Sequence, residues 1–268
     1  NICSFCVVPQ TRGRERSRHP DSILAEVQHL YDNGYKEVTL LGQNVDSYRW
    51  SEDEKIRGKK LIELRDTDKV FNFANLLEEV AKLAPDLRVR FSTSHPKDMH
   101  DNVLHIIAKY PNICNNVHLP VQSGNSELLK KMNRGYTREY YLDRIEAIRR
   151  IIPGCTISTD IITGFCGETN AQHSETISLM EAVKYNLSYM YFYSERPGTL
   201  AAKRYEDDVP EELKKSKLTE VISLQKKHSL AHNKNMVGET VEVLVEKYSK
   251  KSEDDLAGRD NRINMVVF

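Results

Sequence analysis

Two cysteines stand close together at the start of the chain, in the segment Cys3-Ser4-Phe5-Cys6. Thiolates are soft donors that bind zinc or the iron of an iron–sulfur cluster, but such sites usually need three or four ligands. The other cysteines are isolated and form no second Cys-x-x-Cys pair: Cys114, Cys155 and Cys166. The pair therefore either shares a metal with a ligand upstream of Asn1 or acts as a redox dithiol.

A basic segment follows the cysteines within a few residues. It contains four arginines at alternate positions: Arg12, Arg14, Arg16 and Arg18. Guanidinium groups at this density are too polar for a core, and they suit contacts with the phosphates of a nucleic acid. The alternative is a solvated loop whose arginines pair with acidic neighbours such as Glu15.

Polar side chains recur where the short apolar, β-rich runs of the chain end. They are Gln43 and Asn44, Ser92 and Ser94, Gln122 and Ser123, and Thr163. The carboxyl ends of parallel strands carry the chemistry of βα folds, so these residues predict a polar cleft. Taken singly, each side chain is as well explained as a cap of the following helix or a partner of loop amides.

The residues from Cys3 to Arg18 resemble the radical S-adenosylmethionine (SAM) methylthiotransferases. In that family the motif reads Cys-x-x-x-Cys-x-x-Cys, with an aromatic residue just before the last cysteine. Cys3, Phe5 and Cys6 match its second half, so the first cysteine is expected two residues upstream of Asn1. The resemblance implies that Cys3 and Cys6 hold a [4Fe–4S] cluster with one iron open to SAM. Phe5 would pack on the SAM adenine, or it is an ordinary core residue.

Other segments carry the same resemblance, which covers nearly the whole chain. They are Gly42-Gln-Asn-Val45, the run from His118 to Gly124, the run from Met132 to Arg138, Asp160 to Thr169, and Glu195 to Thr199. At Cys166 the family usually has proline, and this cysteine is interpreted as structural. The resemblance implies that the polar residues at the strand ends bind SAM or the substrate base. Arg134 would meet the SAM carboxylate or a tRNA phosphate.

Three tyrosines alternate with apolar residues late in the chain: Tyr189, Tyr191 and Tyr193. Aromatic faces at this spacing suit stacking on RNA bases. A half-buried strand explains the same alternation equally well.

The elements that must position these residues follow an alternating β and α pattern, which predicts an α/β fold with parallel strands. Strands are expected at 37–41, 87–91, 116–121, 156–162 and 189–193. Helices are expected from a cap at Asp21 or Ser22 and at 73–84, 101–109, 137–152, 171–185 and 211–235. Residues 49–70 read as an irregular insertion.

The resemblance implies a partial, open (β/α) barrel of the radical SAM type in residues 1–235, with its first strand missing. The strand from Glu37 would then be an unprotected edge. After residue 235 the pattern changes to polar and apolar alternation, typical of antiparallel strands. Residues 236–268 resemble part of a TRAM domain, a small OB-like barrel that binds RNA.

Composition and length are ordinary for a soluble protein with a real core. The 268 residues carry 39 basic and 39 acidic side chains, so any contact with nucleic acid must come from local patches. Five irregularly spaced cysteines do not form a secreted disulfide framework. No apolar run approaches the roughly 18 residues of a membrane span, and no signal peptide begins at Asn1. The expected location is the cytoplasm.

The Gly42-Gln-Asn-Val45 segment favours the MiaB type of the family, which acts on isopentenylated adenosine in tRNA. The resemblance then implies a transferase that adds a methylthio group to C2 of N6-isopentenyl adenosine next to the anticodon. Its partners would be tRNA and an electron donor. A second [4Fe–4S] cluster, in an N-terminal domain absent from this chain, would supply the sulfur. The chain alone is therefore expected to be inactive.

Two alternatives remain open from the sequence. One is a related methylthiotransferase that acts on threonylcarbamoyl-adenosine in tRNA or on a ribosomal-protein aspartate. The other is a non-catalytic RNA-binding module in which Cys3 and Cys6 hold zinc.

Overall fold

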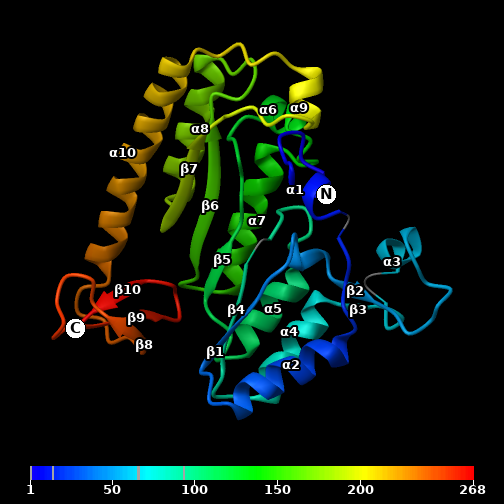
Figure 1. Ribbon diagram of the computed structural model, residues 1–268. Helices are drawn as coiled ribbons and strands as arrows, with labels where there is room; N and C mark the ends of the chain where they lie inside the picture. The colour runs from blue at the N-terminus through cyan, green and yellow to red at the C-terminus, as the bar shows by residue number, and fades with distance from the viewer. Residues whose placement is uncertain (1, 14, 65–66, 93) are drawn as a thin grey trace.

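A computed structural model describes residues 2–13, 15–64, 67–92 and 94–268 of the chain. Its centre is an open, curved array of parallel strands (Figure 1). Strand β1 (Glu37–Leu40) pairs with β4 (Arg88–Phe91), and β6 (Thr156–Thr163) lies between β5 (Asn116–His118) and β7 (Leu187–Phe192). A single bridge between Val89 and Ile113 joins the two groups. The α/β fold and the open barrel expected from the sequence are confirmed.

Helices alternate with these strands along the chain. The longer ones are α2 (Pro20–Asp32), α4 (Phe73–Leu83), α5 (Asp101–Lys109), α7 (Arg138–Ile151), α8 (Asn170–Val183) and α10 (Glu211–Asn235). The short ones are α1 (Val8–Thr11), the 3-10 turn η1 (Val45–Ser47), α3 (Lys59–Glu63), α6 (Ser126–Lys131) and α9 (Leu200–Arg204). In Figure 1 the long helix α10 runs along β7, from the end where α9 lies to the C-terminal sheet.

Side-chain caps decide where several helices begin. Thr137 accepts a hydrogen bond from the Tyr140 amide at the start of α7, and Thr169 forms a capping box with Gln172 at the start of α8. The predicted cap of α2 at Asp21 or Ser22 was wrong. Helix α2 begins at Pro20 instead, because proline suits the first helical position. His19 Nδ1 accepts a hydrogen bond from the Asp21 amide and so caps the helix.

The expected irregular insertion at 49–70 is more ordered than its sequence indicates. Strand β2 (Arg49–Trp50) pairs with β3 (Phe71–Asn72), and α3 lies between them. A ladder of two residues shows no period in a sequence, so the prediction of an unstructured loop was wrong there.

Two hydrophobic clusters form the interior. The larger packs the strands against α4, α5, α7 and α8, and its fully buried members include Leu77, Val117 and Ile148. The smaller cluster lies at the carboxyl ends of the strands: Leu128, Met132, Phe165, Cys166, Tyr193 and Ala201, with Phe5 packed against it. Burial of these apolar side chains fixes the segment that carries the two N-terminal cysteines.

A separate antiparallel sheet follows α10. Strands β8 (Val243–Tyr248) and β10 (Met265–Val267) flank β9 (Leu256–Asp260). Guanidinium groups at the amino ends of the barrel strands hold it, since Arg88 donates to the carbonyl of Arg259 and Arg90 to that of Asp260, both at 2.7 Å. The sheet therefore docks at the barrel end opposite the cysteines.

Candidate functional site

The segment with Cys3 and Cys6 is a tight turn held by Ser4. The Cys6 amide donates to the Cys3 carbonyl at 3.2 Å, which closes the turn. Buried Ser4 donates its amide to the Met132 carbonyl and its hydroxyl to the Lys131 carbonyl, each at 2.9 Å. Its own carbonyl accepts the Ala201 amide at 2.7 Å. The turn is thus fastened to the end of α6 and the start of α9, while both cysteines remain partly exposed.

A buried arginine contacts the first of the two thiols. Arg134 Nη1 lies 3.0 Å from Cys3 Sγ, although 131 residues separate them in the chain. The same guanidinium donates to the Tyr136 hydroxyl at 2.9 Å and to the Pro120 carbonyl at 2.8 Å. This contact fixes the position of the Cys3 side chain through a residue from a distant part of the chain.

The environment of Cys6 differs. Burial raises the pKa of its thiol, and the nearby Cys3 adds to this effect. A metal that binds Cys6 must therefore displace a proton, which makes binding weaker at low pH.

A second polar group lies where β1 and β4 end. Asn44 Nδ2 donates to Asp98 Oδ2 at 2.7 Å, and Arg49 lies 3.7 Å from the same carboxylate. Burial raises the pKa of Asp46 to about 7, with Asp98 adding to the shift. Burial and the nearby Arg134 lower the pKa of His95 to about 3. This group brings the predicted Asn44 close to buried carboxyl groups that sequence reasoning missed.

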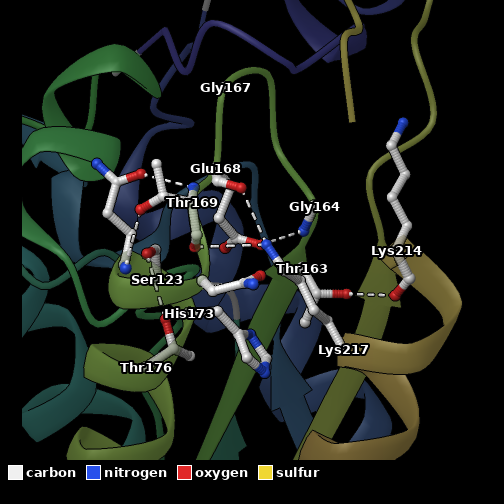
Figure 2. Close-up of polar contacts among 12 residues, drawn as sticks. Ser123, Thr163, Gly164, Gly167, Glu168, Thr169, His173, Thr176, Lys214 and Lys217 are labelled. Carbon is white, nitrogen blue, oxygen red and sulfur yellow. Dashed lines mark hydrogen bonds and ion pairs between the residues drawn. The ribbon is translucent and has the colours of Figure 1, made fainter. Parts of the chain in front are cut away.

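Buried residues at the end of β5 serve local structure. Gln122 has a positive φ of 71°. Its amide donates to the Asp160 carbonyl of β6, and its carbonyl accepts the Ile162 amide. Ser123 Oγ accepts the Asn125 amide at 3.2 Å, and Thr176 Oγ1 accepts the Gly124 amide at 2.9 Å. Figure 2 shows Ser123 and Thr176 facing each other. For Ser123 the geometry matches the alternative in which the side chain is a partner of a loop amide, because Asn125 caps α6 itself.

The loop after β6 is held by a buried ion pair, which Figure 2 shows in full. Glu168 Oε2 accepts the Gly164 amide at 2.7 Å and lies 3.0 Å from Lys217 Nζ on α10. Their side chains are 1% and 3% exposed. The predicted Thr163 lies at the base of this loop, where its hydroxyl contacts the Lys214 carbonyl at 3.4 Å. Sequence reasoning missed the role of Lys217, because a lysine in a charged helix carries no signal of burial.

Phe5 and Cys166 lie in the smaller hydrophobic cluster beside the cysteine turn. The ring of Phe165 meets Tyr193 edge-on, with ring centres 4.9 Å apart. Burial raises the pKa of the Cys166 thiol, which fits the structural role expected for it. Phe5 is only partly buried.

The arginines of the basic segment differ in their surroundings. Arg12 and Arg16 are exposed, and no described carboxylate pairs with either of them. Arg18 lies 2.6 Å from Glu26 and also bonds to Ser22. Arg14 lies outside the described residues.

A cavity of about 1020 Å³ opens beside β1 and α2. Its lining includes four of the predicted site residues: Arg16, Arg18, Gln43 and Asn44. None of its described lining residues is a cysteine. The cavity is therefore distinct from the cysteine turn, and the predicted site residues divide between these two places. Ser92 and Ser94 lie at the end of β4, next to the buried group around Asp46.

The donor set at the turn fits two positions of an iron–sulfur cluster. Two soft sulfur donors point from one turn, and a guanidinium hydrogen bond to a ligand sulfur is a common way to tune such a cluster. Within the described part of the chain, no group of three or more His, Cys, Asp or Glu side chains could enclose a metal ion. The turn alone is an incomplete ligand set.

Comparisons with known proteins agree with this geometry. The family model described as "Radical SAM superfamily" matches residues 1–180. The chain is 54% identical over its whole length to the tRNA-2-methylthio-N(6)-dimethylallyladenosine synthase of Flavobacterium johnsoniae, and 56% identical to the protein of the same name in Amoebophilus asiaticus. It covers 56% and 55% of these proteins, so it spans about half the length of the curated relatives it matches.

Solved structures show the same fold. Methylornithine synthase matches 85% of the chain with a TM-score of 0.54 at 17% identity, and the match covers 59% of that protein. Coproporphyrinogen III oxidase from Escherichia coli, a radical SAM enzyme, also matches 85% of the chain, with a TM-score of 0.55 at 16% identity over 50% of its own length. In the described residues we find no helix with the length and apolar character needed to cross a membrane.

Proposed function

The chain belongs to the radical SAM superfamily, and from this premise we propose that it is the radical SAM part of a tRNA methylthiotransferase. The reaction would add a methylthio group to C2 of N6-isopentenyl adenosine next to the anticodon. The observation that carries the proposal is the cysteine turn, which Ser4 anchors and Arg134 supports through Cys3. The names of relatives at over 50% identity support this choice of acceptor.

In this proposal Cys3 and Cys6 are two ligands of a [4Fe–4S] cluster, and a third cysteine is expected two residues upstream of Asn1. When bound, the cluster supplies the electron that cleaves SAM. The chain's own residues orient the ligands: Arg134 holds the Cys3 sulfur, and Phe5 anchors the turn to the smaller hydrophobic cluster. A second cluster that provides sulfur, and the electron donor, would lie outside residues 1–268.

For SAM we propose a site along the carboxyl ends of the strands. Phe5, Gln122 and Thr163 lie on the cysteine side, and Gln43, Asn44, Ser92 and Ser94 lie on the side of β1 and β4. Among the predicted residues, Ser123, Thr163 and Arg134 are buried and already hydrogen-bonded, so they support this site from behind. In this arrangement Arg134 contacts the cysteine turn and does not contact a tRNA phosphate.

For tRNA we propose that Arg12 and Arg16 contact the phosphate backbone, because both are exposed and no described carboxylate neutralises them. The sheet β8–β10, which resembles part of a TRAM domain, would add contacts from the other end of the barrel.

The test compares the chain as it stands with a version extended upstream through the expected cysteine. Both are reconstituted anaerobically, and iron, sulfide and 5′-deoxyadenosine are measured with SAM and a strong reductant. We expect a cluster and SAM cleavage only in the extended version. No iron and no cleavage in either version would refute the radical SAM chemistry and leave the zinc-binding module.

A further inference from the structure

The face of β5–β7 that points away from α10 carries a row of polar and aromatic side chains. We call it the inner strip: His118, Ser158, Asp160, Tyr189 and Tyr191. Ser188 fixes the orientation, because its hydroxyl contacts Gln225 of α10 at 2.8 Å. Neighbouring residues of a strand point to opposite faces, so Tyr189 and Tyr191 face away from the helix.

The strip is open on this side. Tyr189 is 49% exposed and Tyr191 is 58% exposed, which is unusual for tyrosines in a parallel sheet, whose faces are normally covered. Tyr193 is 3% exposed and belongs to the buried cluster around Phe165. Tyr193 is therefore a core residue, whereas Tyr189 and Tyr191 are accessible for stacking.

Side-chain contacts hold the polar part of the strip in place. His118 Nδ1 lies 3.0 Å from Ser158 Oγ, and its Nε2 lies 3.5 Å from Asp160 Oδ1. Tyr189 is the register partner of Asp160 and meets the His118 ring edge-on at 5.8 Å. Among the described side chains, His118 is the one that pairs with the Asp160 carboxylate. The remaining acceptor positions of Asp160 are free to take an N–H donor.

An exposed aromatic ring next to a fixed carboxylate can bind a nucleobase and recognise its amino group. Bases stack on aromatic rings, and an exocyclic amino group donates to a carboxylate. Asp160 precedes Thr163 by three residues, so the strip lies about 10 Å from the carboxyl end of β6, toward the middle of the barrel. A base held there would lie inside the open barrel, on the interior side of the cysteine turn.

We propose that the inner strip binds the target adenine of the RNA substrate, with the base stacked on Tyr189 and its N6–H group donating to Asp160. The inference rests on the proposed function, which supplies the identity of the base. It adds the residues that select this base and hold it out of the RNA stack.

The experiment uses the intact protein that contains this chain and an anticodon stem-loop RNA with 2-aminopurine at the target position. Stacking quenches 2-aminopurine fluorescence, and because this base has no N6 amino group, this arm reports the stacking on Tyr189 alone. We expect strong quenching by the wild type, loss of most of it in Tyr189→Leu, and retention in Tyr189→Phe, which keeps the ring. Tyr35→Leu is the matched control, because Tyr35 is 57% exposed and lies at the amino end of β1.

A second arm tests Asp160. The wild type should bind RNA with adenosine at the target position roughly fivefold more tightly than RNA with purine riboside, which lacks the amino group. Asp160→Ala should bind the two RNAs equally. Persistent discrimination in this variant would contradict the assignment.

The outcomes separate this inference from the function on which it rests. Failure of the wild type to bind the RNA would overturn both. RNA that binds without quenching, or with equal quenching in Tyr189→Leu, would overturn the inference alone. Weaker SAM binding by Tyr189→Leu with unchanged quenching would assign the strip to SAM and likewise overturn it.

Discussion

Arg134 and Cys3 are joined by a hydrogen bond of 3.0 Å from a guanidinium that is 6% exposed. The same side chain holds Tyr136 and Pro120, so one buried cation ties the cysteine turn to the end of β5. A sulfur ligand that is fixed before the metal arrives loses less conformational freedom on binding.

Replacing Arg134 should therefore affect both stability and metal binding. Arg134→Gln removes the guanidinium that donates to the Pro120 carbonyl and to the Tyr136 hydroxyl, although the Tyr136 hydroxyl still donates to Pro120. We expect a loss of about 1–3 kcal/mol in the free energy of unfolding. Urea unfolding measures it. Arg150→Gln is the control, because Arg150 is 69% exposed and its contact with Asp101 spans 3.8 Å, so its cost should stay below about 0.5 kcal/mol.

The ion pair between Glu168 and Lys217 makes a second prediction. Lys217→Met leaves a buried carboxylate unpaired and should cost about 3–5 kcal/mol in urea unfolding. The double variant Glu168→Gln/Lys217→Met should recover a large part of this loss, because no uncompensated charge remains. Additive losses in the double variant would show that the two groups act independently. Lys215→Met is the control, since Lys215 is on the same helix but half exposed.

These two cases show what the sequence could not supply. The predicted ends of helix α10 match the observed ends. A long segment without glycine or proline can be recognised as a helix from the local sequence alone. The partners of Arg134 and Lys217 are 131 and 49 residues away, and only the tertiary fold brings them together. Sequence reasoning therefore located Cys3, Cys6 and the strand ends, but it assigned Arg134 to an outside ligand.

Asp46 and His95 should give opposite pH dependences of stability. The pKa of Asp46 is raised to about 7, so the folded state holds a proton that the unfolded state has lost, and stability falls as pH rises from about 4 to 7. The pKa of His95 is lowered to about 3, so stability falls as pH drops from about 6.5 to 3. Over the shared range, from about pH 4 to 6.5, the two slopes largely cancel.

Removing one group should expose the slope of the other. We expect the stability of Asp46→Asn, relative to wild type, to rise with pH between about 4 and 6.5, and that of His95→Gln to fall. Urea unfolding at several pH values measures both. Glu54→Gln, at an exposed position, should track the wild type. Parallel curves for all variants would contradict the two assigned pKa values.

Arg12 and Arg16 should dominate the electrostatic part of RNA binding, while Arg18 should contribute less. Arg18 already pairs with Glu26 at 2.6 Å, so an RNA phosphate must compete with that carboxylate. Each phosphate contact releases counterions, and its loss should lower the slope of log affinity against log salt by about 0.7–0.9. We expect Arg12→Gln/Arg16→Gln to lose about 1.5 from the slope, and Arg18→Gln to lose much less. Fluorescence anisotropy with an anticodon stem-loop over a salt series measures these slopes. Equal slopes in the double variant and the wild type would place the RNA on another surface, and the basic segment would then be a solvated loop.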